Sequence, residues 1–343
     1  MWSLVNDEQY IDKSTIMHGT NRVISYSKAV NEALEQMMAI NNSIYCMGQG
    51  INDKNGYWGI TNELSNKFGE ERVFDTPLSE NGMMGIAIGS AIGGMRPVYF
   101  HNRPDFLWLT MDQLINHGTK FNYMSGGQCN VPLVVWAATG KGWGSAAQHT
   151  QALQSVFMHI PGCKVVMPTT PYDAKGLMIS AIIDNNPVMI LEHRLLINQE
   201  GYVPEEMYKI PFGEGVIRKD GIDVTLIGIS LMAKEIDKAT AMLEKDGISV
   251  EVIDLRTIKP WDEKMVINSV KKTGRLVIAD TSWRTCGVSA EIASTVYEKV
   301  FASLKCPIVR LGNKDVPAPA SYPLEEAFYT NANDIYESVK KMF

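Results

Sequence analysis

Short apolar runs alternate with amphipathic stretches along nearly the whole chain of 343 residues. The apolar runs are residues 43–49, 97–100, 131–137, 164–168, 187–192, 223–229, 249–255, 275–280 and 307–312. Helical spacing of apolar residues marks 27–40, 173–183 and 232–247, the last of which ends in a glycine suited to a helix C-terminus. Apolar strands that alternate with helices predict an α/β fold with mostly parallel sheets.

A break in this pattern divides the chain. Residues 198–221 carry two prolines, four glycines and many charges without apolar periodicity. Such composition is typical of a linker, and the length of the chain also suggests two domains. We therefore predict α/β domains over 1–200 and 222–343, joined by a linker over 201–221.

A glycine-rich helix follows an isolated acid in the stretch DTPLSENGMMGIAIGSAIGG, residues 75–94. Read as a helix that begins just after Glu80, it places Gly85, Gly89 and Gly93 on one face. Each glycine weakens a helix interior by roughly 1 kcal/mol relative to alanine. The stripe therefore predicts close packing against another backbone, in this chain or in another, and Glu80 lies at the entrance of the helix, where an acid can simply complement the helix dipole.

Composition narrows the possible partners. The formal net charge is -6 and no dense Lys/Arg block occurs, which argues against nucleic-acid binding. The five cysteines lack metal-ligand or disulfide spacing. Residues 1–19 are too polar for a signal peptide, and no apolar run is long enough to cross a membrane. We expect a cytoplasmic protein that binds neither nucleic acid nor membrane.

The arrangement of Glu80, Gly85, Ile86 and Gly89 resembles the pyrimidine-site motif of thiamin-diphosphate enzymes. The resemblance extends through residues 72–80, 112–128, 131–135, 146–153, 161–188 and 250–262. Together these stretches resemble the β subunit of the first component of 2-oxoacid dehydrogenases of the pyruvate, branched-chain or acetoin type, in the transketolase-like superfamily. The resemblance implies a pyrimidine-binding domain followed by a transketolase C-terminal domain.

The same resemblance assigns roles to individual residues. It makes Glu80 the catalytic acid that hydrogen-bonds the aminopyrimidine of thiamin diphosphate. It makes His149 the active-site histidine that contacts the substrate and the ring of Phe106 the face on which the pyrimidine stacks. Leu78 and Asn102 fall on the wall of the same cofactor pocket. Without the resemblance, a lone histidine or phenylalanine would be read as structural.

The stretch SAIIDNNP, residues 180–187, reads as a helix end followed by an asparagine-rich turn. In the resembling family, backbone carbonyls of this turn and of a neighbouring strand hold a structural monovalent cation. Transfer of that set predicts a potassium site formed by the carbonyls of Leu133, Ala181, Ile182, Asp184 and Asn186.

A diphosphate site is missing from the pattern. The chain contains no Gly-Asp-Gly…Asn arrangement of the kind that holds magnesium and diphosphate in this superfamily. The resemblance implies that a separate α subunit supplies these ligands for Mg²⁺. We therefore expect an α2β2 heterotetramer, to which a lipoyl acyltransferase is a further possible partner.

The chain departs from the resembling family around residues 100–105. Phe100 stands where an acid is usual, Trp136 where pyruvate-type relatives can have arginine, and Gln49 where an acid is common. His101 and Arg103 are also unusual there. Either they belong to a solvated loop, or they line a substrate pocket suited to a more polar or anionic substrate than pyruvate.

Three functions remain open at this point. The leading one is a thiamin-diphosphate-dependent β subunit that decarboxylates a 2-oxo acid and transfers the acyl or aldehyde group to an acceptor. The second is a subunit of a split, transketolase-like ketol transferase acting on a sugar that is phosphorylated or nucleotide-linked, and the third is a non-catalytic β-like assembly chain. The resemblance also makes Cys286 a buried small residue rather than a nucleophile.

Overall fold

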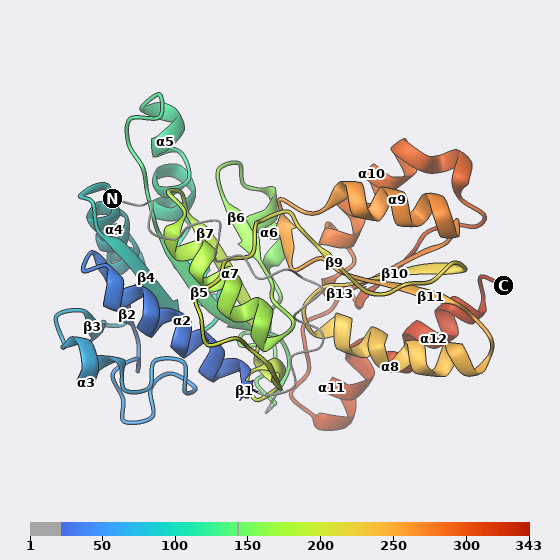
Figure 1. The fold of residues 1–343 in the computed structure, drawn as a ribbon, viewed down its shortest axis with the longest axis horizontal. Coiled ribbons are helices and arrows are strands. Elements are labelled where there is room, and N and C mark those ends of the chain that lie inside the picture. Colours follow the sequence, from blue (N-terminus) through green and yellow to red (C-terminus); the bar gives the residue numbers. More distant parts are fainter. Residues whose placement is uncertain (1–21, 143) are drawn as a thin grey trace. The chain divides into compact units, whose positions relative to one another are not determined.

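The computed structural model describes residues 22–142 and 144–343 and divides them between two compact units (Figure 1). The first unit contains residues up to Ala138 together with Ile160–Phe212, and the second contains Thr139–His159 together with Gly213–Phe343. The stretch 1–19, interpreted above as too polar for a signal peptide, lies outside the described residues. No helix in the described ranges is both long and apolar enough to span a membrane.

The first unit is built on a parallel sheet. Its strands are, in spatial order, β6 (Lys164–Val166), β7 (Val188–His193), β5 (Val134–Thr139), β4 (Arg96–His101), β2 (Ile44–Gly48) and β3 (Val73–Asp75). The pairings of β3 with β2, β2 with β4, β4 with β5 and β6 with β7 are all parallel. Every residue of β2, β4, β5 and β7 is buried, which explains their continuous apolar sequences.

Helices and short connections complete the first unit. They are α2 (Tyr26–Ile40), α3 (Leu64–Phe68), α4 (Glu80–Ile92), η2 (Pro104–Thr110), η3 (Asp112–Gly118), α5 (Phe121–Met124), α7 (Pro171–Ile183) and η4 (Arg194–Leu196). Helices α2 and α7 pack against each other, whereas α4 packs against η2, η3 and β4. A separate antiparallel pair, β1 (Val23–Ser25) with β8 (Glu200–Tyr202), joins the two ends of this unit.

The second unit contains a smaller sheet. Its strands are, in spatial order, β14 (Val309–Asn313), β13 (Leu276–Trp283), β10 (Val224–Gly228), β11 (Val250–Asp254) and β9 (Val216–Lys219). All pairings are parallel except that of β9 with β11. The predicted α/β fold with mostly parallel sheets is therefore confirmed.

Helices cover both faces of the second sheet. The helical segments are α6 (Gln154–His159), α8 (Leu231–Lys245), α9 (Glu263–Thr273), α10 (Val288–Val300), η5 (Phe301–Ser303), α11 (Tyr322–Phe328) and α12 (Ala332–Lys340), and a further strand is β12 (Thr257–Lys259). Helices α8 and α12 pack together on one face, and α9 and α10 pack together on the other (Figure 1). Gly228 permits the close approach of α8, because a Cβ there would lie 2.4 Å from Cα of Ala233.

Local signals fix several helix ends. The Ser25 side chain accepts a hydrogen bond from the Lys28 amide at the start of α2, and Thr170 does the same for Asp173 at the start of α7. Helix α9 ends at Gly274, whose φ of 74° is in the left-handed region. Helices α2 and α7 agree with the helices that the apolar spacing predicts, whereas α9 was not predicted.

The segment that carries His149 is attached to the second unit. Within it, Gln154 is fully buried and its Nε2 donates to Oδ1 of Asp280 on β13 at 2.6 Å. The Ser282 hydroxyl donates to the other carboxylate oxygen of Asp280, also at 2.6 Å. Burial of the carboxylate raises the pKa of Asp280, and these hydrogen bonds partly oppose that shift.

The glycine stripe of α4 has no backbone packed closely against it in the described part of the chain. The helix begins at Glu80 and ends at Ile92, so Gly93 follows its last residue. A Cβ added at Gly89 would meet no atom of the described residues within 4 Å, and one at Gly85 would meet only Cγ of Gln113 at 3.8 Å. The close packing predicted for this face is therefore not made within the described part of the chain.

Candidate functional site

The carboxyl ends of β2, β4, β5 and β7 lie side by side, and this is the edge where open parallel sheets bind ligands. Residues at or just after these strand ends include Gln49, His101, Asn102 and Glu192. They come from separate parts of the sequence. The first unit therefore gathers polar groups at one edge of an otherwise apolar sheet.

Glu80 is the first residue of α4 and is half-buried. Its charge acts on two buried side chains of β4, because it raises the pKa of both Tyr99 and His101. The carboxylate of Glu80 thus faces the side of the sheet to which Tyr99 and His101 point. The first turn of a helix also favours a negative charge, so the position of Glu80 suits a carboxylate.

His101 is 4% exposed and is held in one tautomer. Its Nδ1 lies 3.1 Å from the backbone carbonyl of Arg103, which can only accept, so Nδ1 carries the proton. Burial lowers the pKa of His101 to about 4, although the Arg103 carbonyl and Glu80 oppose the shift. His101 is consequently neutral near pH 7, and its Nε2 is a buried acceptor with no hydrogen-bond partner among the described residues.

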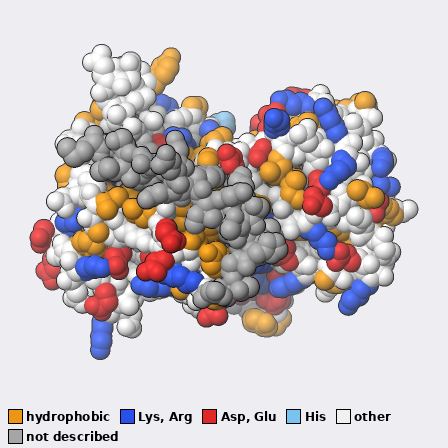
Figure 2. Space-filling view, viewed as in Figure 1, with side chains coloured by type: hydrophobic (Ala, Val, Ile, Leu, Met, Phe, Trp, Pro, Cys, Tyr) orange, Lys and Arg blue, Asp and Glu red, His pale blue; other side chains and the backbone are white. Residues whose placement is uncertain are grey.

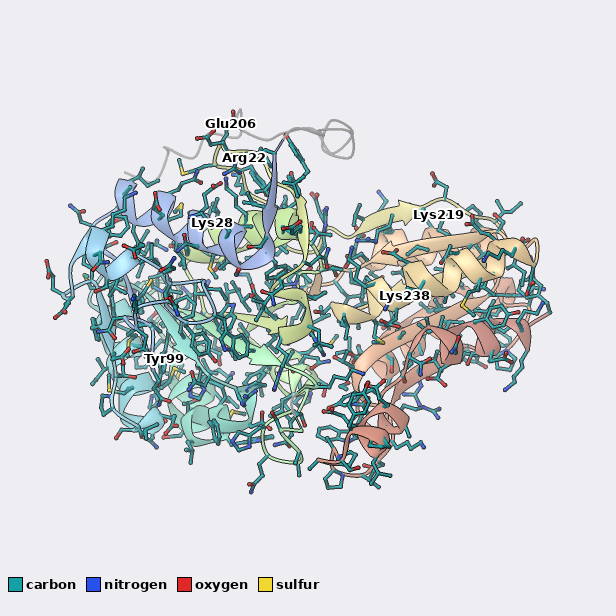
Figure 3. All side chains as sticks on the ribbon, turned by 90° about the horizontal axis from the view of Figure 1, so that it is seen from below. Arg22, Lys28, Tyr99, Glu206, Lys219 and Lys238 are labelled. Atoms are coloured by element: carbon teal, nitrogen blue, oxygen red, sulfur yellow. The ribbon has the colours of Figure 1, made fainter. Side chains whose placement is uncertain are left out.

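Tyr99 is labelled in Figure 3. It lies beside His101 on β4, with 5.5 Å between the ring centroids. The side chain is buried and its hydroxyl has no hydrogen-bond partner in the described part of the chain. Burial, followed by the charge of Glu80, raises the pKa of Tyr99 to about 12. The Tyr99 hydroxyl and Nε2 of His101 are therefore two buried polar atoms without a described partner, on the side of the sheet that Glu80 faces.

The other predicted cofactor residues surround this edge. Phe106 is half-buried in η2, and the side chain of Leu78, just before α4, is 80% exposed. The amide of Asn102 donates to Oε1 of Gln49 at 3.2 Å. Asn102 is thus fixed by the residue that replaces the family's usual acid.

Arg103 is half-buried, and its charge lowers the raised pKa of Tyr57. Arg103 therefore lies near the Tyr57 ring, whose hydroxyl donates to the Asn102 carbonyl at 3.0 Å. The two unusual residues flagged in the sequence differ in chemistry, since His101 offers an uncharged acceptor and Arg103 a cation. Near pH 7 the neutral His101 adds no positive charge for an anionic substrate, so Arg103 is the cation of this pair.

An aromatic cluster occupies the opposite face of β4. Trp136 is fully buried and packs against Phe100 with 5.5 Å between ring centroids. Tyr57 and Trp58 stack on each other, and both meet the Trp136 ring edge-on. The substitutions at Phe100 and Trp136 thus form an apolar cluster rather than a polar pocket.

Glu192 is a buried acid that the sequence analysis missed. It is the last but one residue of β7 and has no exposed surface. Neither carboxylate oxygen has a hydrogen-bond partner within normal limits among the described residues. Burial raises the pKa of Glu192 to about 8, against a smaller opposing effect of Trp136 and Tyr26. The one acid at the end of the apolar run 187–192 was the available signal.

His149 lies in the second unit and is exposed. The loop around it takes unusual backbone conformations, with φ of 62° at Gly144 and 57° at Ala146. The Thr150 hydroxyl donates to the Ala146 carbonyl at 2.6 Å and closes a turn around His149. The loop thus presents the imidazole to solvent within its own unit.

The guanidinium group of Arg96 binds two of the carbonyl oxygens of the predicted potassium site. Nη1 of Arg96 donates to the carbonyls of Ile182 and Asp184 at 3.0 and 2.9 Å, and Nη2 donates to the Asn185 side chain at 2.7 Å. Lys164 binds the carboxylate of Asp184 with both distances at 2.8 Å. The remaining carbonyls of the predicted set belong to Leu133, Ala181 and Asn186.

Two family models match the chain. The transketolase pyrimidine-binding domain matches residues 22–199, and the transketolase C-terminal domain matches residues 213–335. A solved structure described as an inactive β4 tetramer of a split-gene transketolase has a TM-score of 0.76 and 22% identity, covering 93% of this chain and 98% of that one. At this identity the likeness concerns the fold.

Curated relatives match over nearly their whole length. The β subunit of acetoin:2,6-dichlorophenolindophenol oxidoreductase from Cupriavidus necator is 41% identical over 330 residues, covering 93% of this chain and 97% of that protein. The β subunit of the pyruvate dehydrogenase E1 component from Rickettsia felis is 40% identical over 319 residues, covering 93% of this chain and 98% of that protein.

Proposed function

Since the chain belongs to the family of β subunits of thiamin-diphosphate-dependent 2-oxoacid dehydrogenases, we propose that it forms the pyrimidine half of an active site that an α subunit completes. The enzyme decarboxylates a 2-oxo acid and passes the acyl or aldehyde group to an acceptor. The observation that carries this proposal is the position of Glu80, at the start of α4, with its charge directed at two buried and unpaired polar groups of β4.

The residues at this edge suit an aminopyrimidine ring. A ring of this kind needs a carboxylate opposite one nitrogen, acceptors for an amino group and an apolar face. Glu80 supplies the carboxylate, and the unprotonated Nε2 of His101 is a buried acceptor. Phe106 and Leu78 supply apolar surface. When bound, thiamin diphosphate supplies the carbon nucleophile for 2-oxo acid decarboxylation.

The chain's own contribution is proton handling and orientation. Glu80 shares a proton with a ring nitrogen of the cofactor and so controls the protonation of the ring. Neutral His101 and Tyr99 orient the ring and exclude water from the carboxylate. His149 holds or delivers a proton at the substrate, a role that the two ring nitrogens of an imidazole can perform.

The partner and the metal belong to the same proposal. An α subunit holds Mg²⁺ and the diphosphate, and two αβ pairs form an α2β2 heterotetramer, which a lipoyl acyltransferase can join. The five cysteines are all free, which suits the reducing conditions of the cytoplasm. On the face shown in Figure 2, acidic and basic side chains are interspersed rather than sorted into one charged surface.

We also propose that potassium binds next to the Arg96 guanidinium group. A bound ion would share the carbonyls of Ile182 and Asp184 with the Arg96 guanidinium, which is possible because each carbonyl oxygen has two lone pairs. We expect potassium chloride to raise the melting temperature more than tetramethylammonium chloride at equal ionic strength. Identical melting curves in the two salts would exclude the site.

The central test replaces Glu80 in the complex reconstituted with the α subunit. We expect Glu80→Gln to fold and assemble normally but to lose at least about 100-fold in kcat, because an amide cannot share a proton with the ring. Glu70→Gln, a change at an exposed acid before β3, is the matched control. Near-normal turnover of Glu80→Gln would refute the assignment.

The choice of substrate separates the proposed function from the alternative. The reconstituted complex is assayed for thiamin-diphosphate-dependent release of carbon dioxide from 2-oxo acids and, in parallel, for ketol transfer from sugar phosphates. We expect activity with 2-oxo acids only. Ketol transfer without decarboxylation would favour the split transketolase, and no activity with either class would favour an assembly chain.

A further inference from the structure

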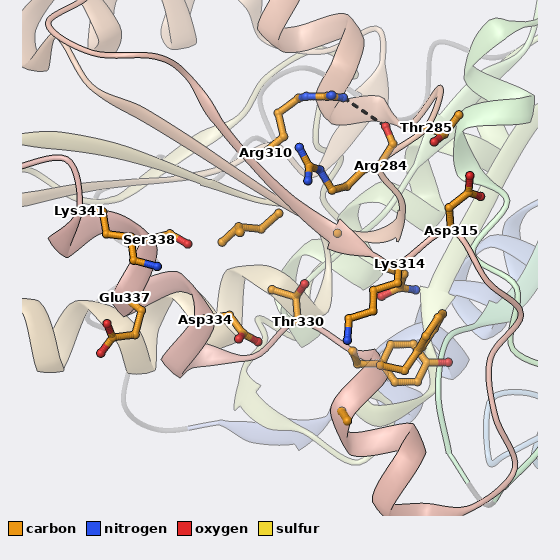
Figure 4. A pocket seen from close by; sticks show the side chains of 16 residues that line it. Arg284, Thr285, Arg310, Lys314, Asp315, Thr330, Asp334, Glu337, Ser338 and Lys341 are labelled. Atoms are coloured by element: carbon orange, nitrogen blue, oxygen red, sulfur yellow. Dashed lines mark hydrogen bonds between the residues drawn. The ribbon is translucent and has the colours of Figure 1, made fainter.

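The second unit contains a cavity of about 770 Å³ that the proposed function does not use (Figure 4). Its lining comes from the loop after β13, from β14 and the residues that follow it, and from the region of α11 and α12. It therefore lies at the carboxyl ends of two parallel strands, where open α/β sheets bind ligands. Its volume is within the range of about 300–1,000 Å³ typical of small-molecule sites.

Two guanidinium groups meet on one side of this cavity. Arg284 follows β13 and Arg310 belongs to β14, and Figure 4 shows the two groups next to each other. Nη1 of Arg310 donates to the backbone carbonyl of Arg284 at 3.1 Å, which holds the pair together. Neither arginine takes part in an ion pair with a carboxylate in the described part of the chain. Adjacent like charges without a counter-ion favour binding of an anion, and guanidinium groups match phosphate oxygens bidentately.

A buried acceptor belongs to one of the residues that line the same cavity. Asn313, the last residue of β14, is 6% exposed, and its Nδ2 donates to the Thr281 carbonyl at 2.7 Å. That bond fixes the orientation of the amide, because a carbonyl can only accept. Oδ1 of Asn313 is left without a hydrogen-bond partner among the described residues. Buried polar atoms are rarely left unpaired, so this atom indicates a donor on a ligand.

The rest of the lining is polar and of both signs. Asp334, Glu337 and Ser338 lie toward the end of the cavity away from the two arginines in Figure 4. The remaining charged residues of the lining are Lys314, Asp315 and Lys341. In Figure 4, Asp315 lies near Thr285, Lys341 lies beside Ser338 and Glu337, and the Lys314 ammonium points away from the two guanidinium groups. The cavity thus offers two guanidinium groups on one side and side chains of both charges on the other.

We propose that this cavity, the Arg284–Arg310 pocket, binds a phosphorylated small molecule that also carries hydroxyl or amino groups. The phosphate binds Arg284 and Arg310, and a hydroxyl or amino donor binds Oδ1 of Asn313. The carboxylates of α12 accept further hydrogen bonds from the same molecule. No residue of the pocket takes part in the proposed cofactor site, so this inference stands or fails separately from the proposed function.

The test measures binding to the full chain by titration calorimetry, with adenosine monophosphate, inorganic phosphate and adenosine as probes. We expect adenosine monophosphate to bind more tightly than inorganic phosphate, and adenosine to bind at least about tenfold more weakly than the monophosphate, a difference of about 1.4 kcal/mol. Arg284→Gln, at an exposed position, should weaken binding of the monophosphate about tenfold or more. Lys264→Gln, an exposed charge on α9, is the matched control and should not change binding.

Three results would overturn the proposal. They are the absence of binding of both phosphate probes at millimolar concentration, equal binding to Arg284→Gln and to the unchanged chain, and equal affinity for adenosine and its monophosphate. A second variant, Lys314→Gln, guards against an unexpected folding defect in the first, and it should weaken binding of the monophosphate by a smaller factor.

Discussion

Glu192 is an acid whose side chain is completely buried, although an ionised carboxylate needs water or a hydrogen-bond partner. A carboxyl group with no exposed surface and a pKa of about 8 is protonated near neutral pH in the folded chain. In the unfolded chain the group ionises near its ordinary value of 4.5. Because the folded pKa is raised, the wild-type protein loses stability as pH rises from about 4.5 to about 8.

We therefore expect Glu192→Gln, which removes the ionisation but keeps the shape, to stabilise the chain increasingly as pH rises. Between about pH 5 and about pH 7.5, the gain in unfolding free energy relative to wild type should grow by about 3 kcal/mol. Urea denaturation at several pH values measures this difference. Any contribution of His101, whose lowered pKa acts in the opposite direction, is common to both proteins and cancels.

The exposed acid Glu298 on α10 provides the control for this experiment. Glu298→Gln should shift stability by about the same small amount at every pH, since a solvated carboxylate keeps nearly the same hydration in the folded and unfolded chains. A difference for Glu192→Gln that is equally flat with pH would show that Glu192 is ionised in the folded protein.

At the scale of an element, α4 combines the proposed catalytic acid with a face suited to contact with another chain. Its first residue is Glu80, and its exposed side carries Gly85 and Gly89 beside Ile86, which is 56% exposed. Glycine inside a helix is costly unless another backbone approaches it closely. An open stripe on this helix is therefore the expected contact surface for the α subunit or for a second β chain.

Substitutions at Gly89 test this reading. Since an added Cβ would meet no described atom within 4 Å, Gly89→Ala should raise the unfolding free energy of the isolated chain by about 1 kcal/mol. Gly89→Leu should leave the isolated chain folded but reduce its association with the α subunit, as measured by light scattering. Ala241→Leu, on the exposed side of α8, is the control. If Gly89→Leu associates as well as Ala241→Leu, the stripe is not a contact surface.

For the whole molecule, the proposal predicts dependence on a partner chain. The described residues contain no group of three or more His, Cys, Asp or Glu side chains that could hold a metal ion. A chain that lacks its own magnesium and diphosphate ligands should bind thiamin diphosphate weakly, because the diphosphate charge is not neutralised. We expect calorimetry with magnesium to detect tight binding only after the α subunit is added. Tight magnesium-dependent binding to the isolated chain would contradict this.

Much of the architecture was predictable because it rests on local pattern. The strands β2, β4, β7, β10, β11 and β13 all fall on the apolar runs identified from the sequence, and α2, α7 and α8 fall on the helical spacings. Fully buried parallel strands need continuous apolar sequence, so they are easy to find. Glu80 and Phe106 were found through motif resemblance rather than through periodicity.

The short pairings were not predictable in this way. Strand β1 pairs with β8 across most of the first unit's sequence, and β9 runs antiparallel to β11. Neither β1 nor β8 carries a long apolar run, since both are partly exposed. Cys286 was expected to be buried, which is wrong, because it is exposed in the loop before α10 with a φ of 52°.

The sequence by itself determined the fold class, the strands and the motif that identifies Glu80, because apolar periodicity and residue spacing are properties of neighbouring positions. Only the tertiary structure decided the chemical state of the groups around them. His101 is neutral and Glu192 protonated because of how strands and helices distant in sequence exclude water from them. Likewise, Arg284 and Arg310 become one anion-binding pair only when β13 and β14 lie side by side, since burial and proximity depend on the packing of separate elements.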